Sequence, residues 1–312
     1  MVFFIYFLFP ISYFQFLLFK GDEVKLLTFS VEGTARPGAL KGDRVVDLAA
    51  AGLPAGPNGG LLEIARGGDA MLDRARRAVG DAKSKTYALS EVKVLPPIRQ
   101  PSKIVAIGLN YIDHCKETGL PVPTVPVPFS KFTTSVCGPY DDIVWPMSVT
   151  KEVDYEVELG VVIGKRARDV AEKDALDYVL GYTVVNDVSA RDLQFLGARQ
   201  WDRSKSLDTF CPWGPYIVTR DEIPDPHVLQ VRTILNGKEM QNSNTKNLTF
   251  NVPYIIAYLS QGTTLLPGDL IPTGTPSGVG FRRTPPVFLK DGDECVCEVE
   301  GIGAIRNRAR PR

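Results

Sequence analysis

Two glutamates separated by a single residue are the first candidates for chemistry in this 312-residue chain. Glu156 and Glu158 lie in the stretch EVDYEVELGVVIG, where acidic and apolar residues alternate from Glu152 to Leu159. In a β-strand this alternation places the acidic side chains on one face, with two carboxylates two residues apart separated by about 7 Å. They can converge on one cation, and oxygen ligands suit a hard divalent ion such as Mg²⁺.

The same alternation also fits a solvated strand face, because charged residues are mostly exposed. However, the acidic stretch continues without a break into the apolar residues 161–164, which favours a strand that is buried on both faces. Burial of unpaired carboxylates is costly, and a bound cation would remove that cost. We therefore prefer a metal site to a solvated surface.

A third acidic candidate follows the next apolar strand, in the segment GYTVVNDVSARDLQ. Asp187 stands where that strand gives way to polar residues, as expected for a strand that ends at a site. It could equally cap the helix that SARDLQ would form. The spacing alone leaves both interpretations open.

A histidine and a glutamate three residues apart form the second candidate, in GLNYIDHCKETG. Asn110 would cap a short helix here and Gly119 would end it. Within that helix His114 and Glu117 are neighbours on one face. A carboxylate beside an imidazole makes a general acid and base pair, although such pairs also occur on helix surfaces without a function.

Composition excludes several other classes of function. Lysine plus arginine and aspartate plus glutamate number 36 each, so no net charge attracts nucleic acid, and we expect none as a partner. The five cysteines form no CxxC pair and are expected to be reduced thiols. Cys115, next to His114, lacks the activating groups of a nucleophile. The segment PGDLIPTGTPSGVG lacks the GK[ST] ending of a phosphate loop.

These candidates must be positioned by a mostly β-stranded region that follows a smaller unit. Residues 21–95 predict a small α+β unit, with strands at 25–30 and 43–50, a turn near Gly33 to Gly38, and helical residues from Leu61 that divide at Gly67 and Gly68. The prolines at 96, 97 and 101 mark the predicted boundary. Residues 96–312 predict many short strands and a helix at 252–261.

The first 20 residues differ from the rest of the chain, because they are almost entirely apolar and rich in phenylalanine. This hydrophobic extension fits an anchor, an uncleaved signal or a misplaced start codon. A membrane is expected as a partner only if the extension is genuine.

Five segments carry a family resemblance. GLNYIDHCKETG, VDYEVELGVVIG, NDVSARDLQ, KSLDTFCPWGP and PGDLIPTGTPSGVG resemble, in this order, motifs of the fumarylacetoacetate hydrolase superfamily, over about residues 103–307. Further segments are similar to one animal branch of it. Pro272 replaces a usual apolar strand residue and should end its strand early, and Leu207 replaces a usual aromatic residue.

The resemblance implies an α+β fold that is mainly β, a mixed β-sandwich roll with a small N-terminal α+β unit. It implies a homodimer that binds Mg²⁺, with Mn²⁺ or Ca²⁺ as alternatives. The roles it implies are metal ligands at Glu156, Glu158 and Asp187, a catalytic dyad of His114 and Glu117 in a lid, an active-site lysine at Lys205, and substrate contacts at Gln194 and Thr275. It also implies a mitochondrial location, although the N-terminus lacks the arginines of a presequence, and the cytoplasm is the alternative.

The function expected on this basis is a metal-dependent enzyme that stabilises the enolate of a small 2-oxo acid. Enol-keto tautomerisation of oxaloacetate ranks first, because the branch resembled is associated with it. The alternatives are hydrolysis of the carbon-carbon bond of acylpyruvates and other 2,4-dioxo acids, and decarboxylation of oxaloacetate. A catalytically inactive scaffold is not favoured, because all three acidic residues and His114 are present.

Overall fold

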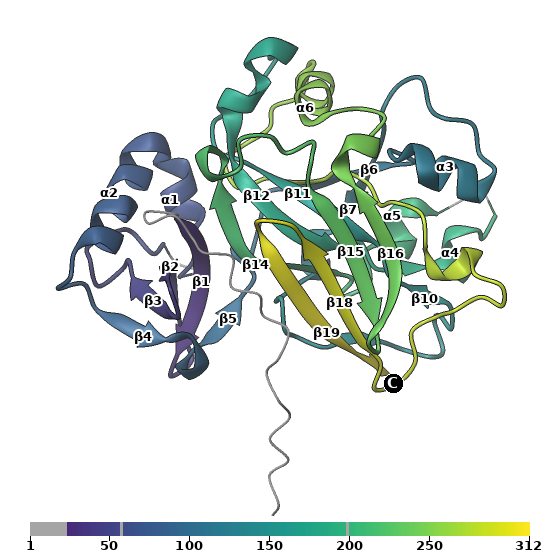
Figure 1. Ribbon diagram of the computed structural model, residues 1–312, viewed down its shortest axis with the longest axis horizontal. Coiled ribbons are helices and arrows are strands. Elements are labelled where there is room, and N and C mark those ends of the chain that lie inside the picture. The colour runs from purple at the N-terminus through teal and green to yellow at the C-terminus, as the bar shows by residue number, and fades with distance from the viewer. Residues whose placement is uncertain (1–23, 57–58, 198–199) are drawn as a thin grey trace, which may run out of the picture.

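The computed structural model describes residues 24–56, 59–197 and 200–312. The predicted hydrophobic extension at residues 1–20 lies outside these residues. Within them, no helix is long and apolar enough to cross a membrane. Strands dominate and helices are short, which confirms the expected mainly β, α+β fold (Figure 1).

The N-terminal unit is a curled sheet with two helices packed on one side (Figure 1). Its elements are β1 (Lys25–Val31), β2 (Thr34–Lys41), β3 (Arg44–Asp47), α1 (Leu62–Arg66), α2 (Gly68–Gly80), β4 (Thr86–Ala88), the 3₁₀ turn η1 (Leu89–Glu91) and β5 (Lys93–Leu95). The helices separate at Gly67 and Gly68, as predicted, because Gly68 adopts a φ of +57°.

The predicted turn from Gly33 to Gly38 is wrong in its extent. The turn is confined to Glu32 and Gly33, and Pro37 and Gly38 lie inside β2, opposite β1. Gly38 is needed there for packing, since a Cβ atom would lie 2.8 Å from the ring of Phe29. A glycine selected for close packing was thus mistaken for a turn residue.

Two packed sheets form the rest of the molecule (Figure 1). The strands that complete the larger sheet are β6 (Ile104–Gly108), β7 (Val127–Lys131), β8 (Val136–Cys137), β11 (Val157–Ile163), β12 (Val179–Asn186), β14 (Cys211–Thr219) and β17 (Leu270–Pro272). The smaller sheet contains β9 (Ile143–Trp145), β15 (Gln230–Leu235), β16 (Lys238–Asn244), β18 (Glu294–Val299) and β19 (Gly303–Pro311). Apolar side chains of both sheets share one core, which confirms the sandwich arrangement.

Short helices and turns cover the edges of the sandwich. They are α3 (Ile112–Thr118), α4 (Arg191–Gln194), α5 (Trp201–Ser204), α6 (Val252–Ser260) and the 3₁₀ turns η2 (Thr133–Ser135), η3 (Glu172–Tyr178), η4 (Arg220–Glu222), η5 (Thr245–Asn247) and η6 (Gly280–Arg282). A two-stranded ribbon joins β10 (Val153–Asp154) to β13 (Ser189–Ala190). As predicted, β17 ends at Pro272, which has no N–H to donate.

The two units share one continuous sheet, because β1 of the N-terminal unit pairs with β14 at Lys25–Val218 and Leu26–Ile217. The order across the larger sheet is β4-β3-β2-β1-β14-β12-β11-β17-β6-β7. The proline-rich boundary therefore separates two units along the sequence, but backbone hydrogen bonds between β1 and β14 join them in one sheet.

The central pair, β11 and β12, positions the acidic residues. Every residue of both strands is buried, as the uninterrupted apolar run predicted. The strands are antiparallel, with Val157 opposite Asn186 and Glu158 opposite Val185. The start of β11 therefore lies beside the end of β12, and residues at these two points meet at one edge of the core.

Candidate active site

Three carboxylates meet where β11 begins and β12 ends. One oxygen each of Glu156, Glu158 and Asp187 lies within 4.8 Å of the others, and the exposed fractions of these residues are 4%, 2% and 0%. The backbone holds the ends of the two strands together, since the Asp187 N–H donates to the Glu156 carbonyl at 2.8 Å. Asp187 does not cap a helix, because α4 begins at Arg191, beyond β13.

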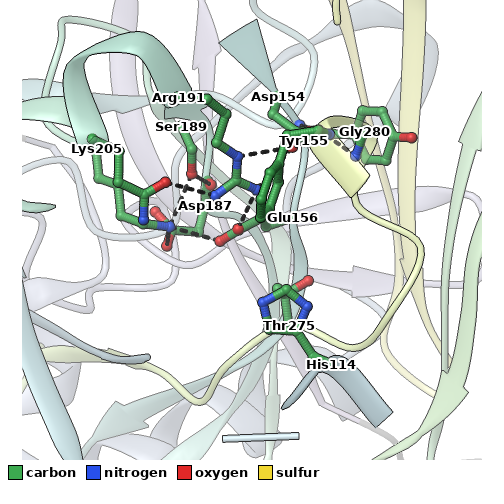
Figure 2. A network of polar contacts seen from close by, with 12 residues as sticks. His114, Asp154, Tyr155, Glu156, Asp187, Ser189, Arg191, Lys205, Thr275 and Gly280 are labelled. Atoms are coloured by element: carbon green, nitrogen blue, oxygen red, sulfur yellow. Dashed lines mark hydrogen bonds and ion pairs between the residues drawn. The ribbon is translucent and has the colours of Figure 1, made fainter. Parts of the chain in front are cut away.

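A buried lysine bridges two of these carboxylates (Figure 2). The Lys205 Nζ donates to Glu156 Oε2 and Asp187 Oδ2, both at 2.6 Å, and to the Ser189 hydroxyl at 2.9 Å. Burial disfavours the charge of Lys205, but Asp187 and Glu156 outweigh it and raise the pKa of Lys205 above its usual value. The lysine therefore stays charged inside the site.

A second buried lysine supports the cluster from β7. The Lys131 Nζ donates to Asp187 Oδ1 at 2.6 Å and also to the backbone carbonyl of Lys205. Lys131 is 2% exposed. One side chain thus fixes both a carboxylate and the segment that carries the active-site lysine.

Arg191, at the start of α4, links the cluster to a deeper carboxylate. Its guanidinium donates to Glu156 Oε1 at 2.6 Å and to Asp154 Oδ2 at 2.9 Å (Figure 2). Asp154 also accepts from the backbone N–H groups of Gly280 at 2.7 Å and Phe281 at 3.1 Å. Arg191 thus bridges two carboxylates through charge-assisted hydrogen bonds, which restrict the orientation of all three side chains.

The pKa values of Glu156 and Glu158 are shifted in opposite directions. Burial opposes ionisation of Glu156, but Lys205 and Arg191 outweigh it and lower the pKa of Glu156. Burial and the charges of Asp187 and Glu156 raise the pKa of Glu158 well above its usual value. Among the described residues, the hydrogen bond found at the Glu158 carboxylate comes from the Gly274 N–H, at 2.8 Å. Glu158 is therefore the carboxylate with the least compensated charge.

The chemistry of these donors fits a divalent cation. Three buried carboxylates offer hard oxygen ligands at one point, and the uncompensated charge of Glu158 would be neutralised there. Lys205 already neutralises part of the charge of the other two.

The predicted dyad lies on α3. The Nδ1 atom of His114 is 3.2 Å from Glu117 Oε2, and the other Glu117 oxygen accepts from the Gly278 N–H at 2.8 Å. His114 is 6% exposed. Its ring lies apart from the carboxylates in Figure 2, and it lines the same cavity as they do. The structure thus brings the dyad and the carboxylates to one site.

The N-terminal end of α3 differs from the prediction. The helix N-cap is Tyr111, and Asn110 does not cap it, because the Asn110 amide instead joins the Phe250 and Thr273 backbone. Gly119 ends the helix with a φ of +69°, as predicted.

The two predicted substrate contacts line the same cavity. The Gln194 Oε1 accepts from Arg191 at 2.8 Å, so its amide NH₂ is the group it can offer to a ligand. The Thr275 hydroxyl donates to the Val157 carbonyl at 3.0 Å and accepts from Gln241 at 2.8 Å. Thr275 is therefore already tied to β11.

Sequence reasoning missed three charged residues of the site: Lys131, Asp154 and Arg191. Asp154 belongs to the acidic strand face that was recognised, and Arg191 to the polar cluster after Asp187. Their partners could have been inferred from the need to neutralise buried charge. Lys131 had no such signal, because it lies in an unremarkable segment between prolines and threonines.

Comparison with known proteins agrees with this architecture. Residues 103–310 match the family described as "Fumarylacetoacetate (FAA) hydrolase C-terminal". This chain belongs to the fumarylacetoacetate hydrolase family. A human relative named "Oxaloacetate tautomerase FAHD2A, mitochondrial" is 48% identical over 249 residues, which are 80% of this chain and 79% of the relative.

Solved structures of this family share the fold. The fumarylacetoacetate hydrolase of Exiguobacterium antarcticum has a TM-score of 0.81 and 37% identity, covering 93% of this chain and 100% of that chain. Maleylpyruvate hydrolase from Sphingobium, in complex with manganese(II) ion and pyruvate, has a TM-score of 0.77 and 31% identity, covering 92% and 99%. The chain is thus an enzyme of the fumarylacetoacetate hydrolase family in fold and sequence.

Proposed function

We propose that this chain is a divalent-metal-dependent oxaloacetate tautomerase, with Mg²⁺ as the first choice of ion and Mn²⁺ or Ca²⁺ as alternatives. The observation that carries the proposal is the convergence of Glu156, Glu158 and Asp187 in a cavity that His114 also lines. The name of the human relative supports the substrate, and the manganese complex of the Sphingobium hydrolase supports the metal.

The cluster would bind the ion and the 2-oxo acid end of the substrate. An ion held by the three carboxylates would supply a Lewis acid that favours the enolate form of a 2-oxo acid. Lys205 places a fixed positive charge beside Glu156 and Asp187, where negative charge develops on the enolate oxygen. The Gln194 amide can donate to the substrate carboxylate.

The dyad would move the proton. With Nδ1–H donated to Glu117, the Nε2 atom of His114 carries a lone pair, and Glu117 is itself fixed by Gly278. Nε2 can accept the proton of the enol hydroxyl and deliver it to C3, which forms the keto acid without net change in atoms. This assigns proton transfer to α3 and charge stabilisation to the strands.

The proposal is tested by following the absorbance of enol-oxaloacetate with the protein, Mg²⁺ or Mn²⁺, and then excess chelator. We expect accelerated ketonisation that is lost on chelation and restored by added metal. Full activity after complete metal removal would contradict the proposal. Lys83→Ala changes an exposed residue of the N-terminal unit and is the control for activity lost during chelation and metal exchange.

Carbon-carbon hydrolysis is the second candidate, favoured by the likeness to maleylpyruvate hydrolase. The same dyad could activate a water molecule for attack on the distal carbonyl of a 2,4-dioxo acid. Acetylpyruvate in the same assay separates the two functions, since hydrolysis releases pyruvate and tautomerisation does not. Pyruvate release from oxaloacetate would instead indicate the third alternative, decarboxylation.

We also propose a mitochondrial location and a homodimeric state. The location is supported by the names of the rat and human relatives, and cell fractionation tests it. The dimer is supported by exposed apolar side chains within residues 132–149, where Phe132, Tyr140 and Met147 are 54%, 50% and 43% exposed. Light scattering should show a dimer for the wild type and a monomer for Phe132→Asp.

A further inference from the structure

Two pairs of aromatic rings line the active-site cavity. Phe129 and Trp201 meet edge to face, with ring centroids 5.4 Å apart. Phe195 and Phe281 form the second pair, with centroids 5.6 Å apart. All four rings line the cavity that contains the carboxylates.

In each ring pair, one ring lies beside a buried cation of the site. The Lys205 Nζ is 5.1 Å from the centre of the Phe129 ring, and the Arg191 guanidinium carbon is 4.3 Å from the centre of the Phe281 ring. A ligand that reached from the carboxylates toward the opening would therefore pass from charged groups to aromatic rings within a few ångströms.

The position of the Trp201 ring depends on a glycine of β6. Gly108 lies against Trp201, and a Cβ atom at position 108 would be 2.1 Å from the indole ring, so the ring approaches β6 as closely as it does only because residue 108 is glycine. Phe195 is 51% exposed, although exposure of a large apolar side chain to water is unfavourable. A ligand that covered Phe195 would remove this exposed apolar surface.

The cations of the cavity are already paired with carboxylates. Among the described residues that line it, the lysine and arginine side chains are Lys205 and Arg191, and both are paired with Glu156. Each lies beside one ring, Lys205 at Phe129 and Arg191 at Phe281, with its charge paired to a carboxylate. A second carboxylate on C3 of the substrate, as in oxaloacetate, therefore finds no free basic side chain there, whereas an apolar substituent finds two ring pairs.

We infer that the site also tautomerises arylpyruvates, with the enol of phenylpyruvate as the representative substrate. The inference rests on the proposed function, because it assumes that the 2-oxo acid end binds at the carboxylates. The aryl group on C3 would then lie against these aromatic rings of the cavity. The enol O–H bond breaks and a C3–H bond forms, so the step needs no further reactant.

The test compares ketonisation of the enols of phenylpyruvate and oxaloacetate by the same metal-loaded protein. We expect acceleration of both. In Phe195→Ala, we expect the ratio of kcat/KM for phenylpyruvate to that for oxaloacetate to fall about 10-fold, because a lost apolar contact changes discrimination by one to two orders of magnitude. The neighbouring Leu196→Ala is the matched control, since Leu196 is 62% exposed and does not line the cavity.

The outcomes distinguish the inference from the function on which it rests. Turnover of oxaloacetate without phenylpyruvate would overturn the inference and leave the proposed function intact. Turnover of phenylpyruvate alone would support the inference and overturn oxaloacetate as the substrate. An equal fall in the ratio for Phe195→Ala and Leu196→Ala would show that the Phe195 ring does not select the aryl group.

Discussion

The carboxylate cluster and the His114–Glu117 dyad share one cavity but are held in place in different ways. Glu158 lies in β11, whose residues are all buried, and Glu156 directly precedes this strand. The strand pairs with β12 along its length and with β17 from Gly160 to Val162. The dyad lies on a seven-residue helix that is joined to the rest by side-chain hydrogen bonds, such as Asp113 with Ser243 at 2.6 Å.

This difference matches two different chemical tasks. Ligands for a cation need fixed positions, which the sheet supplies through backbone pairing and buried ion pairs. A proton carrier must approach substrate and withdraw, and a short helix anchored by side-chain hydrogen bonds opens at a lower free-energy cost than a core strand. We therefore expect substitutions in the strands to affect metal binding, and substitutions at α3 to affect turnover.

The largest effect is expected from Glu158→Gln. Loss of one carboxylate should abolish metal binding and reduce activity by at least 10³-fold, because the bound ion supplies several kcal/mol of transition-state stabilisation. Calorimetric titration with Mn²⁺ and the tautomerase assay measure this. Since the raised pKa of Glu158 reflects an unfavourable buried charge, the metal-free variant should unfold at no lower urea concentration than wild type. Normal Mn²⁺ binding would reject its role as a ligand.

His114→Gln should lower kcat by about 10²-fold or more, the usual contribution of a general acid or base. The affinity for Mn²⁺ should change less than 2-fold, because the ring is not part of the carboxylate cluster. This contrast between turnover and metal affinity is the direct test of the two-region description. A parallel loss of both would contradict it.

Lys131→Met should lower the free energy of unfolding more than it lowers proton transfer by His114 and Glu117. Removing the lysine leaves Asp187 with one buried partner fewer, and breaking a buried ion pair costs about 3–5 kcal/mol of unfolding free energy. Urea unfolding measures the loss. Lys93→Met, whose partner is Asp141 and whose side chain is 66% exposed, is the control and should cost less than about 1 kcal/mol.

Arg282→Ala should have the smallest effect. Its guanidinium donates to the Glu117 carbonyl at 3.1 and 2.8 Å, near the end of α3, where a cation stabilises a helix by about 0.3–1 kcal/mol. We expect kcat to fall about 2- to 5-fold, with Mn²⁺ affinity unchanged. Lys290→Ala, an exposed change outside α3, should leave both parameters as in wild type.

The sequence predicted the parts of the site that depend on periodicity. Alternation around Glu156 and Glu158, and the polar residues after the strand that ends at Asp187, follow from strand geometry. Lys131 and the ring pair of Phe129 and Trp201 could not be predicted, because their contacts join segments far apart in the chain. Pro37 and Gly38 were misassigned for a related reason, since packing against β1 and β3 overrides their usual preference for turns.

The pairing of β1 with β14 limits how this enzyme can be dissected. Cutting the chain at the prolines near residue 96 would remove β1 and expose the backbone N–H and C=O groups of β14 near Ile217 and Val218. An unpaired strand edge of this kind recruits other strands and promotes aggregation. The small unit thus acts as a cover for the catalytic sheet, and a shortened protein that omits it should associate through that edge.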